Sequence, residues 1–338
     1  MLGKWVRGLG VTVAALAVLG SGAWGLGAVV TERAIADWLA ARAGEGWLVN
    51  YADIAVGGYP TAFETRIEEL ELADPETGWL WSLPVLRLES PALEPGRLLV
   101  VLPPEQGLAS PGERLTVTSG AMTSALELRP RDRFALDLSE TALREVRVES
   151  STGWVMTLPE GRLGVTRQEG REAAYDVSFA ARGLTPPPGL RAVLDPADLL
   201  PEAIGTLDYR AGMAFDRPWD LRAIAERRPQ ITALDLRELN AVWGGLVFRA
   251  AGRLDVDAAG LPEGELALRA ENWREMVAMA ARAGLIPQGL QGTAEGLLEV
   301  LAGLSGDPGV IDARLRFAEG RMFLGPLPLG PAPVLRLR

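Results

Sequence analysis

The chain has 338 residues, of which 48% are hydrophobic, and this is enough to bury a sizeable core. Its formal net charge of −10 disfavours nucleic acid as a partner, because phosphate binding requires a basic surface. Cysteine and histidine are both absent, which removes the usual transition-metal ligands and the usual general base. We therefore expect no catalytic residue, no metal site and no cofactor, and a protein that is not an enzyme.

The N-terminal segment predicts a membrane anchor. Residues 8–30 carry no charge and follow Lys4 and Arg7. At 1.5 Å per residue this stretch covers a hydrocarbon core of about 30 Å. The basic residues before it predict a cytoplasmic stub over 1–7, a transmembrane helix over 8–30 and a single-pass inner-membrane location with the remainder periplasmic. A cleaved signal peptide is the alternative.

The same helix is expected to continue over 31–43, and residues 44–338 are expected to form a periplasmic domain. This domain shows alternating apolar positions, as in Leu86-x-Leu88 and Leu266-x-Leu268, separated by Pro- and Gly-rich turns. The pattern predicts a mostly β fold, an antiparallel meander that forms a curved sheet or β-groove. The Pro-rich segment 185–189 divides it into two possible lobes.

One alternating run changes phase. Phe63 and Ile67 share one parity, whereas Leu70 and Leu72 share the other. Because a shift of one residue turns every following side chain to the opposite face, we expect a β-bulge or a strand break near residues 68–69.

A few short helices are expected late in the chain. Residues 272–284 begin with a capping-box pattern and end at Gly284, and residues 293–304 carry leucines at helical spacing. A further short helix is possible over 195–203, with Pro196 at its first position.

Three tryptophans are the candidate ligand-binding residues. Trp79 and Trp81 lie two positions apart and are followed by Leu83, so they would share one face of a strand. They could fill a core, or they could line an open apolar groove, to which Trp273 and its helix would add a wall. A pair of distant carboxylates that hydrolyses a glycan is a less favoured alternative.

Several turns and strand ends carry a family resemblance. They comprise Gly58-Tyr59-Pro60 with Phe63, Trp81-x-x-Pro84, Pro91-Ala-Leu-x-Pro95, Trp243-Gly244, the run from Gly252 to Gly264, Asn272-Trp273 and the ending from Glu319 to Gly330. In these the chain resembles the domain-of-unknown-function 2125 family, over most of its length. That family is mainly alphaproteobacterial and has no assigned activity, so no functional residue is implied.

The overall layout is similar, more weakly, to AsmA-like envelope proteins, which are implicated in moving phospholipid or in outer-membrane assembly. The resemblance implies a non-enzymatic protein that handles lipid or assists envelope assembly. Its expected partners are the inner membrane, a phospholipid and an envelope protein. A protein-interaction scaffold is the alternative, because architecture alone does not establish function.

Overall fold

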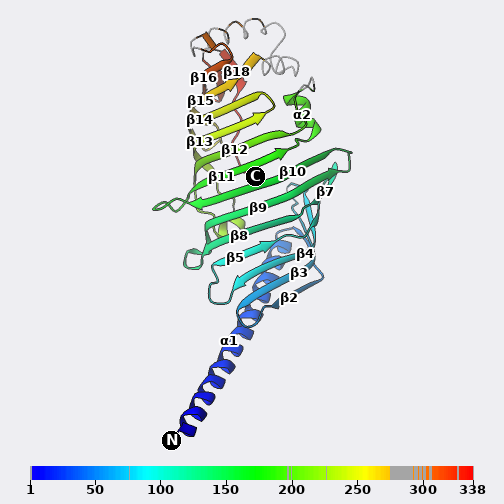
Figure 1. Cartoon of the computed structure of the whole chain (residues 1–338), viewed down its shortest axis with the longest axis vertical. Coiled ribbons are helices and arrows are strands. Elements are labelled where there is room, and N and C mark those ends of the chain that lie inside the picture. The colour runs from blue at the N-terminus through cyan, green and yellow to red at the C-terminus, as the bar shows by residue number, and fades with distance from the viewer. Residues whose placement is uncertain are drawn as a thin grey trace.

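The computed structural model describes residues 2–337 apart from 76, 196–197, 199, 226, 326 and most of 275–306, and the side chains of its first helix from Gly20 onward. Within this part, eighteen strands form one antiparallel sheet with few helices (Figure 1). The prediction of a mostly β, antiparallel fold is therefore confirmed.

The elements follow one another along the chain in a simple order. The first half contains α1 (Leu2–Gly44), β1 (Leu48–Asn50), β2 (Asp53–Gly57), β3 (Ala62–Ala73), β4 (Leu80–Pro91), β5 (Arg97–Val101), β6 (Glu105–Ser110), β7 (Glu113–Thr118), β8 (Ala121–Arg129), the 3₁₀ helix η1 (Pro130–Asp132), β9 (Ala135–Ser150) and β10 (Val155–Arg167). The second half contains β11 (Ala174–Leu184), α2 (Pro188–Leu194), β12 (Ile204–Phe215), α3 (Leu221–Ala225), β13 (Ile231–Trp243), β14 (Leu246–Val256), β15 (Pro262–Glu271), β16 (Val310–Ala318), β17 (Arg321–Leu324) and β18 (Leu327–Pro331).

From β9 onward each strand pairs with the next one in sequence. Tight turns make this possible: Gly244 and Gly245 alone join β13 to β14, and Trp243 pairs directly with Leu246. Gly244 has a φ of 58°, and a Cβ there would lie 2.8 Å from Pro201. Glycine is thus required both for the turn and for the close approach of residue 201.

The sheet divides between β4 and β9. The first part of β4 pairs with β6 and its second part with β5. In the same way β9 pairs with β8 through its first part and with β7 through its last residues. Two short pairs, β5–β8 and β6–β7, therefore lie next to each other and connect the same two long strands.

Breaks in the ladder accompany this division. Glu69 has a φ of 51°, and neither it nor Pro84 opposite it is paired, although Glu68 pairs with Val85 and Leu70 with Leu83 in one unchanged register. The predicted disruption near residues 68–69 is therefore confirmed as a break in pairing, without an inserted residue. Glu145 of β9 has the same φ and, with Pro159 opposite it, is likewise unpaired in the ladder with β10. In both places a proline faces the residue of positive φ, and proline has no N–H to donate to the ladder.

The chain is unusually open for its size. Its accessible surface is 19666 Å², whereas a compact protein of this mass would expose about 13,000 Å². The buried residues form several separate clusters along the sheet rather than one core. This follows from a single-layered sheet, beyond which α1 projects (Figure 1).

The C-terminal part of α1 packs on the first strands. Leu39 is 1% exposed and contacts a cluster formed by Ile54, Ile67, Leu70 and Leu83. The left-handed backbone conformation of Glu69, with a φ of 51°, is what allows Ile67 and Leu70, which have opposite parity, to reach the same cluster.

The prediction of a single-pass inner-membrane protein is wrong. Among the residues that the structure describes, no helix combines the length and the apolar character that crossing a membrane requires. The end of the expected span instead contacts the turn between β2 and β3: Trp24 stacks on Phe63 and its Nε1 donates to the carbonyl of Ala62 at 2.9 Å. Ser21 and Tyr59 share a hydroxyl hydrogen bond of 2.5 Å.

The helices expected over 272–284 and 293–304 lie largely outside the described residues. Around the helix expected over 195–203, the structure shows α2 ending at Leu194, and Asp195 accepts a hydrogen bond from the backbone of Leu200 at 2.9 Å. On either side of the Pro-rich segment 185–189, β11 and β12 pair directly with each other.

The α1 contact gives a stability test. We expect Leu39→Ala to lower the free energy of unfolding by about 2–5 kcal/mol, because it leaves a cavity in a fully packed site. Chemical denaturation of the full chain measures this. Leu26→Ala, the same change on the same helix at a residue that is 68% exposed, should have little effect. An equal loss in both variants would contradict the assigned packing.

Candidate functional site

The sheet from β10 to β16 has one face on which charged side chains are absent over three neighbouring rows. Strand register places these side chains on the same side, because alternate residues of a strand point to one face and paired residues lie opposite each other. The central row is Leu163, Phe179, Tyr209, Leu239, Ala250, Leu268 and Ala313. The rows beside it are Val165, Val177, Ala211, Leu236, Gly252, Leu266 and Leu315, and Gly161, Ala181, Leu207, Ala241, Phe248, Ala270 and Ile311. We name these three rows the apolar face.

The large side chains of the central row are only half buried. The small residues Ala181, Ala211 and Ala250 are buried, whereas Phe179 and Leu268 remain partly accessible. In the rows beside the centre, Leu236 and Ile311 are buried. Leu163 is 38% exposed. A second layer of structure would bury the large side chains first, so the described chain leaves the middle of this face uncovered.

One margin of the apolar face is covered by two segments. The connection between β12 and β13 packs over Tyr175, which is fully buried and accepts a hydrogen bond from the backbone N–H of Trp219 at 3.1 Å. Beyond it, the C-terminal segment brings Ala332 against Leu254 and Phe317. Along this side the sheet therefore ends in a packed wall.

The opposite margin is covered as well. Leu200 packs on Trp243 and Leu246, which are both buried. At the end of the sheet Trp273 is 2% exposed and contacts Ile311, Ala270 and Ala313. The half-buried rows thus lie between two fully buried borders.

Polar groups are sparse on the apolar face. The Tyr209 hydroxyl lies within it, and burial raises the pKa of this tyrosine. Toward β8 the rows continue as Ser139, Thr141 and Ser124, in which the Thr141 hydroxyl donates to the Ser124 oxygen at 2.9 Å. These hydroxyls are uncharged and can accept or donate hydrogen bonds within an otherwise apolar surface.

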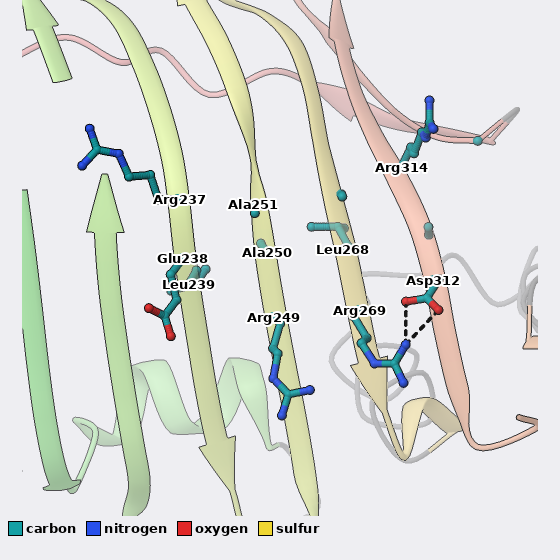
Figure 2. Close-up of a pocket in the computed structure, with 13 residues that line it drawn as sticks. Arg237, Glu238, Leu239, Arg249, Ala250, Ala251, Leu268, Arg269, Asp312 and Arg314 are labelled. Carbon is teal, nitrogen blue, oxygen red and sulfur yellow. Dashed lines mark hydrogen bonds and ion pairs between the residues drawn. The ribbon is translucent and has the colours of Figure 1, made fainter. Parts of the chain in front are cut away.

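The opposite face of the same strands is charged and carries a basin of about 650 Å³. Its lining comprises Arg237, Glu238, Leu239, Arg249, Ala250, Ala251, Ala267, Leu268, Arg269, Asp312, Ala313, Arg314 and Gly325. The lining combines two rows of the charged face with Leu239, Ala250, Leu268 and Ala313, the central-row residues that lie between those two rows in sequence. The charged residues that surround the basin all belong to the charged face. The alanines leave its floor shallow, and the arginine side chains spread away from it (Figure 2).

The arginines of this basin already have acidic partners. Arg237 pairs with Asp176 at 2.8 Å, and Arg269 pairs with Asp312 at 2.9 Å. Arg249 and Arg314 pair with Glu271 and Glu265 at 2.9 and 3.6 Å. Because each cation has a carboxylate beside it, the basin has little capacity for a further anion.

A smaller cavity of about 200 Å³ lies at the ends of β8, β9 and β10. It is lined by Arg129, Arg131, Asp132, Arg133, Ala135, Arg167, Glu172, Pro218 and Asp220. Burial alone would raise the pKa of Asp220, but hydrogen bonds from Arg133 and from the backbone of Ala223 and Arg222 hold it below its usual range. Asp220 thereby fixes the loop between β12 and α3 to the turn before β9.

The three tryptophans expected to bind a ligand do not converge. Trp79 is 42% exposed and precedes β4, and Trp81 packs beside the α1 cluster, where its Nε1 donates to the Gln106 amide oxygen at 3.1 Å. Trp273 lies at the other end of the sheet and is buried. Their role in ligand binding stays a prediction, and only Trp273 contacts the apolar face.

Sequence reasoning did not single out the rows that form the apolar face, although their signal was present. Apolar and polar residues alternate along each strand as expected. Which apolar residues of neighbouring strands lie beside one another depends on the strand register, and the alternation does not predict that register. In the described part of the chain, no group of three acidic residues is placed to hold a metal ion.

The fold and the candidate site define a large, mostly β protein built on one antiparallel sheet. The chain belongs to the family described as "Uncharacterized protein conserved in bacteria (DUF2125)", whose model matches residues 24–333. Comparison with curated proteins and with solved structures found no match.

The low pKa of Asp220 predicts a pH effect. Because the folded-state pKa lies below the unfolded value of about 3.9, the carboxylate's contribution is complete above that pH and is lost as the pH falls through the folded-state pKa. We expect Asp220→Asn, which keeps an acceptor for the N–H groups of α3, to be less stable at neutral pH and to lose less stability on acidification.

Unfolding free energies measured from neutral to acidic pH provide the test. Asp37→Asn, at an exposed position of α1, serves as the control and should leave the pH dependence unchanged. If Asp220→Asn lost as much unfolding free energy on acidification as the native chain does, the ion pair with Arg133 would not be a source of stability.

Proposed function

We propose that the protein is a non-enzymatic lipid-binding protein that holds acyl chains along the apolar face. The observation that supports this proposal is the half-exposed state of large apolar side chains between two buried margins. A monomeric soluble protein rarely leaves a contiguous apolar surface of this extent without an occupant. The occupant must therefore be apolar and elongated.

The dimensions of the face agree with acyl chains. Seven strands from β10 to β16 extend over about 29 Å at a spacing of 4.8 Å. One leaflet of a bilayer corresponds to about 15 Å of extended hydrocarbon. The face is therefore long enough for a lipid whose chains lie across the strands.

The sheet is proposed to be curved into a trough with the apolar face inside. A bulge in β13 between Leu236 and Leu239 and the left-handed backbone of Glu145 in β9 bend the strands. The two packed margins would form the trough's walls. Curvature brings more apolar surface around each acyl chain than a flat sheet offers, and so increases the area removed from water.

The chemistry of the surface favours binding over catalysis. The polar atoms within the face are hydroxyls, such as those of Tyr209 and Thr141, and no charged side chain belongs to the three rows. Acyl chains need only apolar contact, whereas acid–base chemistry requires titratable groups within reach of the substrate. We therefore place the function in the holding of a lipid rather than in its conversion.

The test uses Leu163, the most exposed large residue of the central row. We expect Leu163→Asn to weaken the binding of a fluorescent fatty acid about ten- to a hundredfold, which corresponds to the loss of one Leu side chain's burial. Fluorescence titration of the full chain measures the affinity. Native mass spectrometry of the same preparations would reveal co-purified lipid.

Thr166→Asn is the matched control, because Thr166 lies on the same strand but on the opposite face. It should bind the probe as the native chain does, and both variants should keep the native thermal transition. Equal affinity of the native chain and both variants, or an absence of binding in all three, would disprove the proposed function.

A further inference from the structure

The cavity of about 200 Å³ at the ends of β8, β9 and β10 lies beyond one margin of the apolar face, and no residue of the three rows lines it. Arg167 lines this cavity and lies two residues after Val165, on the same face of β10. Two residues of a strand extend over about 7 Å. A molecule whose acyl chains lie on the apolar face can therefore place its polar end in this cavity.

The cavity has a defined wall. The backbone N–H of Leu136 donates to the carbonyl of Trp219 at 2.8 Å, which joins β9 to the loop after β12. The same loop supplies Pro218 and Asp220 to the lining, and the Asp220 carboxylate accepts from Arg133 at 3.0 Å. These bonds hold the loop against the strand ends and keep the cavity's shape.

Most of the charges around the cavity are paired within the protein. Arg129 pairs with Asp132 at 3.1 Å, and Arg133 pairs with Asp220 at 3.0 Å. Arg167 pairs at 2.8 Å with Asp137 of β9, which lies outside the cavity lining. In these three pairs each cation has one carboxylate, so they add no net charge.

One lining residue of each sign is left. Among the described residues, neither Arg131 nor Glu172 makes a hydrogen bond or an ion pair, and both are exposed. The cavity thus presents one unpaired guanidinium and one unpaired carboxylate. This arrangement complements a ligand that carries one negative and one positive group.

We propose that this cavity binds the headgroup of a zwitterionic phospholipid, with its phosphate at Arg131 and its ammonium at Glu172. Arginine matches the geometry of phosphate oxygens, and a carboxylate accepts hydrogen bonds from an ammonium group. A purely anionic headgroup would leave Glu172 facing a like charge. The inference rests on the proposed function, because the acyl chains are placed on the apolar face.

The experiment compares three short-chain probes with identical acyl chains: phosphatidylethanolamine, phosphatidylglycerol and diacylglycerol. Isothermal titration calorimetry of the full chain below the micelle concentration gives each affinity. We expect the native chain to bind phosphatidylethanolamine at least about tenfold more tightly than the other two, the size of one charge-assisted hydrogen bond. Free phosphoethanolamine should bind much more weakly, because it lacks the acyl chains.

The variants separate the two charges. Arg131→Ala should weaken phosphatidylethanolamine and phosphatidylglycerol about tenfold or more and leave diacylglycerol unchanged. Glu172→Gln should weaken phosphatidylethanolamine alone. Arg253→Ala, on the charged face of β14 and outside the cavity, is the matched control and should leave all affinities unchanged.

The outcomes distinguish this inference from the function on which it rests. If the native chain binds all three lipids equally and the variants change nothing, the headgroup site is disproved while acyl binding stands. Free phosphoethanolamine that binds as tightly as the lipid would also overturn it, since the cavity would then act without the apolar face. An absence of binding for every lipid would overturn both proposals.

Discussion

Strand register is the constraint on which the rest of this structure depends. Because side chains alternate with a period of two, a slip of one residue between β14 and β15 would turn β15 over relative to β14 and bring Arg269 to the apolar face. The three uncharged rows exist only because seven consecutive strands keep the same phase. Hydrogen-bonded pairing sets this phase strand by strand, so each hairpin fixes the position of the next.

Bulges maintain this phase where the sequence departs from strict alternation. In β13 the apolar residues change parity between Leu236 and Leu239, and the structure has its register shift there. The change between Ile67 and Leu70 in β3 occurs without a register shift, at Glu69, whose φ of 51° departs from extended backbone. Without these irregularities, part of each strand would direct its leucines to the opposite face. They are therefore part of how the sequence specifies two distinct faces.

These examples show how much of the fold the sequence can predict. Alternation is a local signal, and it predicted the antiparallel strands and the disruption at Glu69. The same parity change at residues 236–239 was equally readable. Alternation does not predict which residues of neighbouring strands are paired. The three rows of the apolar face therefore follow only from the observed pairings, such as Leu163 with Phe179 and Phe179 with Tyr209.

Long-range contacts could not be predicted in this way. The tie between Arg133 and Asp220 joins residues far apart in sequence, and no local pattern relates them. The anchor prediction failed for a related reason, since an apolar helical stretch has the same composition whether it meets lipid or protein. Here Trp24 of that stretch stacks on the ring of Phe63, and Ser21 forms a hydrogen bond with the hydroxyl of Tyr59.

The remaining surfaces of the sheet show why the apolar face stands apart. At one edge of the sheet, α1 packs beside β1 and β2. The strand at the other edge, β18, contains Pro328 and Pro331, which cannot donate ladder hydrogen bonds. The charged face carries ion pairs, such as Arg269 with Asp312. Removing these charges from water would be costly. The edges are thus protected and the charged face favours water. Among these surfaces of the described chain, it is the apolar face that gains free energy when it is covered, and this contrast is the basis of the proposed function.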